Sequence, residues 1–315
     1  MPRIEKPQEG KPPDEKPRDE KHLIPFLAMP LLLLAVEIGA LVLSRPVQES
    51  GIVAFQNPSS VENPFIFIAI LLVFTGFLLV LIRFGLKRVI AAVLGISIFL
   101  TFVYIFAAVL SVLISDPGIA AVTVLVLSLV ATALLYWFPE WYIIDTLGVL
   151  IGAGVASIFG VSLDILPVII LLLLLAVYDA ISVYKTKHMI TLAEGVMDMK
   201  TPILFVVPKR RDYSFIRDGI GKLEEGGERA AFIIGMGDMI MPSMLVVSAN
   251  VFIQGWRLFG LVNLPALGAI VGSLAGLALL LTFVMSGKPQ AGLPPLNGGT
   301  ILGFLIGWAA MLWVG

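Results

Sequence analysis

The sequence predicts an all-α integral membrane protein, built as one bundle of nine transmembrane helices. Apolar residues make up 58% of the 315 residues and charged residues only 14%, whereas about a quarter of a typical soluble domain is charged. The apolar residues gather in runs of about 20, the length that an α-helix needs to cross a bilayer. No long polar stretch separates these runs into two domains.

Nine apolar runs can be delimited by their breaks. The predicted spans are, in order, Leu23–Leu43, Pro64–Ile82, Val89–Ile114, Ala120–Phe138, Tyr142–Phe159, Asp164–Tyr184, Arg229–Phe252, Leu264–Met285 and Gly298–Val314. A turn signal over 115–118 separates the third from the fourth, and Pro139-Glu140 with flanking tryptophans separates the fourth from the fifth. The fifth is short and rich in glycine, which makes it the weakest candidate by composition.

Two segments outside the spans are polar. Residues 1–21 alternate proline with charged residues and have nothing to bury, so they predict a disordered tail before a single membrane domain over 22–315. A hydrophilic insert over 185–228 follows the sixth span. Within it the pattern predicts an amphipathic helix over 190–199, a strand over 201–208 and a mobile stretch over 219–228.

The basic residues orient the bundle. If the N-terminus is cytoplasmic, all 21 lysines and arginines fall on the cytoplasmic side except Arg45 and Arg257. The positive-inside rule therefore predicts a multi-pass protein of the cell membrane, with its N-terminus in the cytoplasm and its C-terminus outside.

Composition also excludes several classes of protein. The chain has no cysteine, which rules out disulfides, iron–sulfur ligation and a thiol nucleophile. A net charge of −1 gives no overall positive potential that would attract nucleic acid. The two histidines, His22 and His188, do not form a His-Glu-x-x-His motif, so neither a metal nor another cofactor is expected.

Two aspartates inside apolar runs carry the functional signal. Asp179 ends the sixth span and Asp238 lies in the seventh. A carboxylate within the bilayer costs at least about 2.5 kcal/mol, so such a residue usually has a function. Counted along helices from Lys185 and Arg229, the two acids lie about 9 and about 13 Å from the same membrane surface. Adjacent packing of the two helices would place the carboxyl groups face to face.

Two close carboxyl groups cannot both ionise easily, so one is expected to hold a proton while the other acts as a base. Such a pair can activate a water molecule and protonate a leaving amine, as in aspartic peptide hydrolysis. The alternative is a proton-coupled transporter or ion-leak channel that uses the same two acids. Of the other acids, Glu37 is expected to contact a neighbouring helix, and Asp145 and Asp164 to be caps or rim charges near helix ends.

The two motifs together resemble a known family. Tyr178-Asp179 on one helix and Gly235-Met-Gly237-Asp238 on the next are similar to the GxGD-type signatures of the presenilin and signal peptide peptidase family. The family's third signature is Pro-Ala-Leu at the start of the last helix. Its place is taken here by Pro294, Pro295 and Leu296, while a literal Pro265-Ala-Leu267 opens the eighth predicted span and is interpreted as a coincidence.

The resemblance implies an intramembrane aspartyl endopeptidase of the microbial, presenilin-like kind, with a nine-helix fold. It implies that Asp179 and Asp238 are catalytic, and that Tyr178, Gly235, Gly237 and the segment from Pro294 to Leu296 shape the active site. The substrates would be transmembrane proteins in the lipid bilayer. The short, single-chain form predicts activity without accessory subunits and leaves a homo-oligomer open. An edge strand over 203–207 would hold the unwound substrate by β-augmentation.

Overall fold

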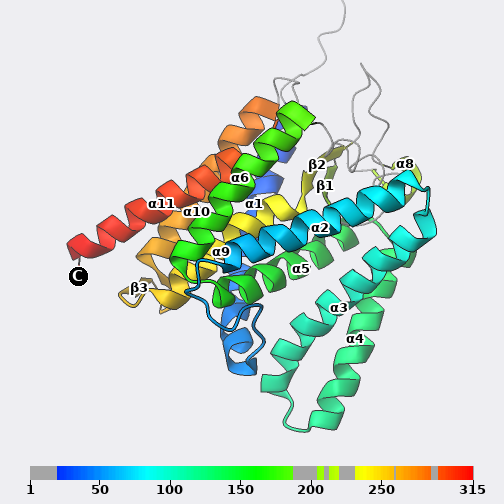
Figure 1. Ribbon diagram of the computed structural model, residues 1–315, viewed down its shortest axis with the longest axis horizontal. Helices are drawn as coiled ribbons and strands as arrows, with labels where there is room; N and C mark the ends of the chain where they lie inside the picture. The colour runs from blue at the N-terminus through cyan, green and yellow to red at the C-terminus, as the bar shows by residue number, and fades with distance from the viewer. Residues whose placement is uncertain are drawn as a thin grey trace, which may run out of the picture.

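The computed structural model describes residues 20–186, 204–208, 213–219, 231–258, 260–284 and 290–314. These residues form a bundle in which eight helices are long and apolar enough to cross a membrane (Figure 1). The eight are α1 (Glu20–Ser50), α2 (Asn63–Arg83), α3 (Lys87–Leu113), α4 (Pro117–Trp137), α5 (Trp141–Ser162), α6 (Ile165–Ile181), α10 (Leu264–Val284) and α11 (Leu293–Val314).

The predicted helical membrane bundle is confirmed, whereas the count of nine spans is not. The remaining apolar helix, α9 (Met236–Phe252), has only 17 residues. Helix α6 is equally long, but it continues as a π-helix, η1 (Ser182–Thr186), so its apolar span covers Ile165–Lys185. The predicted tail lies outside the described residues except for Glu20 and Lys21, which belong to α1. The predicted amphipathic helix over 190–199 and most of the stretch over 219–228 also lie outside them.

The seventh predicted span was wrong at its start. Residues Ala231–Gly235 form a strand, β2, and the helix begins only at Met236. β2 pairs antiparallel with β1 (Leu204–Pro208), which lies where the sequence predicts a strand. An apolar run of this length suits a strand and a helix equally well, and the pairing with β1 decides between them.

The glycine-rich helix α5 lies at the centre of the bundle. It packs against α1, α3, α9 and β1, and half of its most apolar stretch is buried. Its glycines allow this close packing: a Cβ at Gly160 would lie 2.6 Å from Cβ of Val247, and one at Gly148 would lie 2.9 Å from Cε of Met236. The composition that made this span the weakest candidate therefore reflects its central position.

By contrast, α2, α3 and α4 expose most of their apolar surface. Only 11% of the most apolar stretch of α2 and 17% of that of α3 is buried. Figure 1 shows α3 and α4 as a pair that diverges from the rest of the bundle. Apolar helices of this kind present their side chains to lipid.

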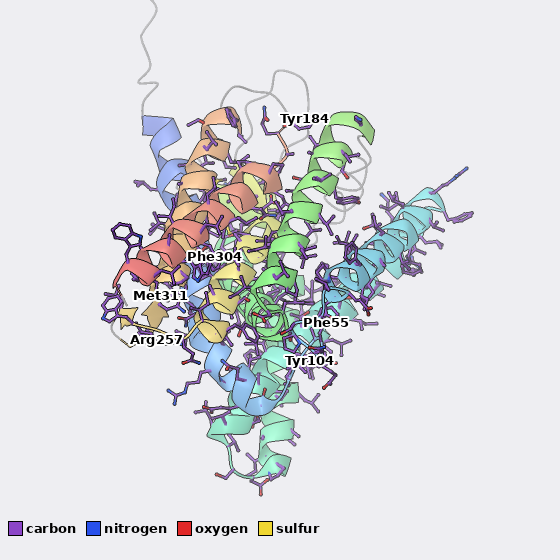
Figure 2. The ribbon with its side chains drawn as sticks, turned by 60° about the vertical axis from the view of Figure 1, so that its left-hand side comes forward. Phe55, Tyr104, Tyr184, Arg257, Phe304 and Met311 are labelled. Carbon is purple, nitrogen blue, oxygen red and sulfur yellow. The ribbon has the colours of Figure 1, made fainter. Side chains whose placement is uncertain are left out.

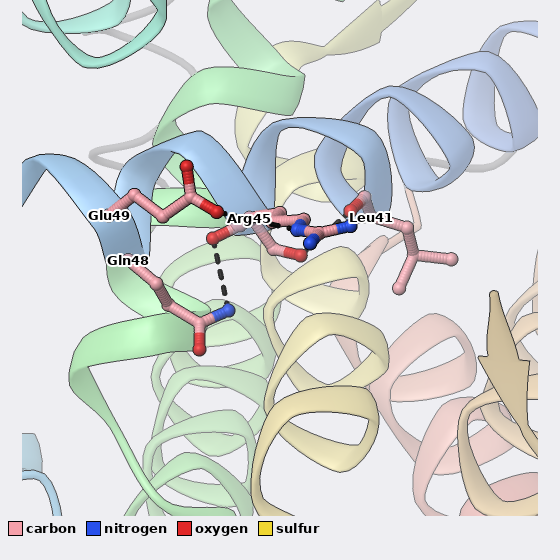
Figure 3. A network of polar contacts seen from close by, with 5 residues as sticks. Leu41, Arg45, Gln48 and Glu49 are labelled. Atoms are coloured by element: carbon pink, nitrogen blue, oxygen red, sulfur yellow. Dashed lines mark hydrogen bonds and ion pairs between the residues drawn. The ribbon is translucent and has the colours of Figure 1, made fainter. Parts of the chain in front are cut away.

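Helix α1 runs past its predicted end at Leu43. Its last turns are polar, and their side chains bond along the helix (Figure 3): Arg45 Nε lies 3.4 Å from Glu49 Oε1, and Gln48 Nε2 donates to the Ser44 carbonyl at 3.1 Å. Such i to i+4 contacts let the helix continue beyond the apolar run. Deeper in α1, the buried Glu37 accepts a hydrogen bond from Ser273 on α10 at 2.6 Å, so it does contact a neighbouring helix.

The helices α10 and α11 are in backbone contact. Three glycines of α10 (Gly268, Gly272, Gly276) face three of α11 (Gly299, Gly303, Gly307). A Cβ at Gly272 would lie 2.9 Å from Cα of Gly303, so any side chain here would push the helices apart. The pair fixes the position of the N-terminus of α11, where the candidate site lies.

Candidate active site

Asp179 lies near the end of α6 and is buried, with 5% of its surface exposed. Helix α6 starts where Asp164 accepts a hydrogen bond from the Ile165 N–H at 2.7 Å, which is the capping role expected for Asp164. After Ile181 the chain widens into a π-helix, η1 (Ser182–Thr186). Asp179 therefore lies at the end of a regular helix, just before a change in its geometry.

Asp238 lies in the first turn of α9, directly after β2. The N-terminus of a helix carries partial positive charge, which favours a carboxylate in its first turn. Gly235 ends β2 and caps the helix, and a Cβ there would be in ordinary contact with Asp238 Oδ2, at 3.5 Å. A Cβ at Gly237 would meet no described atom within 4 Å. The space beside Gly237 is therefore open in the part of the chain that the structure describes.

The two acids meet at the start of α11. The Leu293 N–H donates to Asp179 Oδ2 at 3.0 Å, and the Gly292 N–H donates to the same carboxyl group. A Cβ at Gly292 would lie only 2.9 Å from Asp238 Oδ2. Both carboxyl groups therefore border Gly292, and Asp179 is close enough to act electrostatically on Asp238.

The prolines lie inside α11, which begins at Leu293 and not at Gly298 as predicted. Proline fits the first turn of a helix because the N–H groups there have no partner in the helix. Pro294 and Pro295 have no N–H to donate, and the amide that bonds Asp179 is that of Leu293, directly before them. Leu296 is buried with 1% exposed, packing in a cluster with Phe205, Met236 and others.

The predicted site residues differ in how closely they approach this point. Asp179, Asp238 and Gly235 lie at it, Pro294 and Pro295 border it through the helix start, and Leu296 packs behind it. Tyr178 adjoins Asp179 and has a partner of its own. The sequence analysis did not identify Gly292 as a contact of both acids, although a glycine two residues before a pair of prolines is a visible signal for a tight backbone approach.

The literal Pro265-Ala-Leu267 lies at the other end of the bundle. It opens α10, where Asn263 Oδ1 accepts from the Ala266 N–H at 2.9 Å. Asn263 also bonds the end of α9, donating to the Ala249 carbonyl at 2.7 Å. Since α9 is about 25 Å long, this end is far from Asp238 in its first turn.

The sheet formed by β1 and β2 stands beside Asp238 and is held by α5. The Val206 N–H donates to Asp145 Oδ1 at 2.8 Å. Asp145 was predicted to be a wet cap or rim charge, and this was wrong: it is buried, with 8% exposed. The reason is that β1 folds back onto the N-terminal part of α5 and covers it.

Nearby, Glu140 accepts hydrogen bonds from Ser214 Oγ at 2.7 Å and from the Phe215 N–H at 3.0 Å, both of which belong to the predicted insert. These contacts hold the start of the short helix α8 (Phe215–Asp218) against the start of α5. Among the residues that the structure describes, no three His, Cys, Asp or Glu side chains are grouped as metal ligands.

Comparisons with known proteins bear on this arrangement. The family model described as signal peptide peptidase, presenilin aspartyl protease matches residues 29–312, which include both acids. Among solved structures, a presenilin family intramembrane aspartate protease in the C222 space group is 54% identical, with a TM-score of 0.68 over 91% of this chain and 99% of that one. Another such structure, in the P2 space group, is 53% identical, with a TM-score of 0.67 over 91% and 98%. No curated protein matches the chain.

Proposed function

This chain belongs to the signal peptide peptidase and presenilin family of aspartyl proteases, and we propose accordingly that Asp179 and Asp238 are its catalytic residues. As an intramembrane aspartyl endopeptidase, it hydrolyses peptide bonds within transmembrane segments of membrane proteins. The observation that carries the proposal is that both carboxyl groups border the same residue, Gly292, at the start of α11. A transporter needs no such shared backbone contact, and nothing supports that alternative.

Both acids take part in the proposed reaction. One carboxylate removes a proton from a water molecule whose oxygen attacks the carbonyl carbon of the substrate. The other carboxyl group, which is protonated, gives its proton to the carbonyl oxygen. The tetrahedral intermediate then loses the amine as its C–N bond breaks and the nitrogen takes a proton from the pair. The amide of Leu293 holds the Asp179 carboxylate in place before the substrate arrives.

We propose that the substrate adds to β2 and not to β1. Val206 points its N–H away from β2, because that N–H is already bonded to Asp145. In an antiparallel pair, two residues that lie opposite each other either both point their N–H groups towards the partner strand or both point them away from it. Ile233 lies opposite Val206, so its N–H points away from β1. No further strand pairs with β2 among the described residues. The edge that leads into Asp238 is therefore open to an extended peptide.

The direct test of the catalytic pair uses the purified full chain with a tagged single-span substrate and mass spectrometry of the fragments. Wild-type protein is expected to cut within the span, and Asp179→Asn and Asp238→Asn are each expected to lose all cleavage. Asp164→Asn is the matched control, since Asp164 lies at the other end of α6, and it should keep activity. Cleavage by either of the first two variants would refute the proposal. Cleavage by the purified chain would also support activity without accessory subunits.

The open edge is tested by Ile233→Pro against Ile233→Ala. Both variants lose the isoleucine side chain, but only proline removes the N–H that points away from β1. Proline is expected to reduce cleavage at least tenfold more than alanine, with unfolding temperatures that agree within a few degrees. Equal cleavage by the two variants would exclude this edge as the substrate's partner.

We also propose that α9 is the ninth span, that the sheet end of the bundle is cytoplasmic and that the C-terminus lies outside. The distribution of basic residues supports this orientation. Because the chain has no cysteine, single cysteines can report the side of the membrane. In sealed cells, an impermeant maleimide should label Trp256→Cys and leave Ile216→Cys unlabelled; both positions are exposed in the structure. The reverse pattern would invert the orientation.

A further inference from the structure

The end of α6 makes a second contact with the segment that enters α11. The Tyr184 hydroxyl donates to Gln290 Oε1 at 2.9 Å, and the Ala291 N–H donates to Tyr184 Oη at 3.4 Å. Figure 2 shows Tyr184 at this end of α6, beside the chain that leads into α11. Gln290 and Ala291 immediately precede Gly292 and Leu293, whose amides bond Asp179.

The π-helix η1 accounts for the reach of Tyr184. In a continuous α-helix, the side chain five positions after Asp179 would point about 140° away around the axis. A π-helix has more residues per turn, with bonds from i to i+5, and so turns Tyr184 back towards the side on which Asp179 lies. Both side chains of this helix end can then reach the same segment.

Four consecutive residues are therefore held from one helix end. Tyr184 bonds Gln290 and Ala291, while Asp179 bonds Gly292 and Leu293. Residues 290–292 precede the first turn of α11 and belong to no helix or strand, so side-chain contacts set their path. Tyr184 is 56% exposed and thus contributes little to the core, which leaves the hydroxyl contact as its distinctive interaction.

We propose that Tyr184 is a positioning residue, whose hydroxyl holds Gln290 and Ala291 so that Gly292 and Leu293 present their N–H groups to Asp179. The proposal rests on the proposed function, because it takes Asp179 as catalytic. Its effect belongs to the chemical step, since Tyr184 acts through the backbone that orients the carboxylate and not through the β2 edge proposed for the substrate.

The test compares Tyr184→Phe with Gln290→Ala and with the double variant, in purified full-length protein. Removal of one neutral hydrogen bond is expected to lower kcat about fivefold with KM unchanged. Because both side chains belong to one contact, the double variant should fall no further than the lower single variant. Tyr104→Phe is the matched control, since Tyr104 is 55% exposed on α3 and lies well away from Tyr184 in Figure 2.

Three results would overturn the proposal: wild-type kcat in Tyr184→Phe, losses that multiply in the double variant, or a loss of kcat matched by a lower unfolding temperature. Failure of the proposed function is seen separately. Asp179→Asn runs in the same assay, and cleavage by that variant would refute the catalytic pair whatever Tyr184→Phe does.

Discussion

The backbone amide of Leu293 bonds the carboxyl group of Asp179 at 3.0 Å, joining residues 114 positions apart. The bond connects the end of α6 with the start of α11, and Asp238 lies against Gly292, one residue earlier. The two acids are therefore aligned by a third element as well as by the helices that carry them.

Gly292→Ala is expected to reduce activity at least tenfold while the fold persists. The new Cβ would lie 2.9 Å from Asp238 Oδ2 and 3.2 Å from its Cγ, so the carboxyl group must move. The measurement is kcat beside thermal unfolding in detergent. Gly298→Ala, in the helix that follows, is the control, because a Cβ there meets no described atom within 4 Å. Equal activity in the two variants would contradict the prediction.

Gly237→Ala is expected to spare the free enzyme and impair substrate binding. A Cβ at Gly237 meets no described atom, and alanine suits a helix better than glycine, so the unfolding temperature should not fall. If the open space receives the substrate, KM should rise severalfold. An unchanged KM, measured over a series of substrate concentrations, would show that the substrate does not approach this side of Asp238.

Asp145 is expected to matter through its acceptor atom and not through its charge. Asp145→Asn retains an oxygen for the Val206 N–H and should lose little activity. Asp145→Ala leaves that buried N–H without its partner, at a cost of about 1–3 kcal/mol, and frees β1 from α5. Kinetics and unfolding of the two variants can be compared directly. If alanine and asparagine behave alike, the contact does not hold the sheet.

Gly272→Ala should destabilise the protein by about 1–3 kcal/mol, because the added Cβ would meet the backbone of α11 at Gly299 and Gly303. Displacement of α11 should also reduce activity, since it moves Gly292 and Leu293 relative to the acids. Chemical unfolding and cleavage report the two effects. Gly95→Ala on α3, where a Cβ meets no described atom within 4 Å, should show neither effect.

Sequence reasoning located the two acids because a carboxylate inside an apolar run is rare and costly. It could not place β2, because Ala231–Gly235 has no periodicity that separates strand from helix, and its partner β1 lies earlier in the chain, within the preceding insert. For the same reason Asp145 was assigned to a wet rim: its position along α5 was visible, but β1 covering it was not. These errors all concern contacts between distant segments.

The start of the last helix shows a different limit of prediction from sequence. The predicted ninth span, Gly298–Val314, leaves Pro294 and Pro295 outside the helix, although the first turn of a helix accepts proline. The start of α11 at Leu293 is what brings Gly292 beside both acids. A rule about local conformation thus allowed two answers, and only the packing of α11 on α10 and α6 distinguishes them.

The central position of α5 has a consequence for how this protein can change over evolutionary time. A helix whose glycines touch α1, α3 and α9 must retain small residues, since each larger side chain would require compensating replacements on several neighbours. The lipid-facing surfaces of α2, α3 and α4 carry no such requirement and can drift among apolar residues. Related sequences should therefore diverge fastest at the periphery of the bundle and slowest in α5. This central helix is also the least hydrophobic of the first five spans.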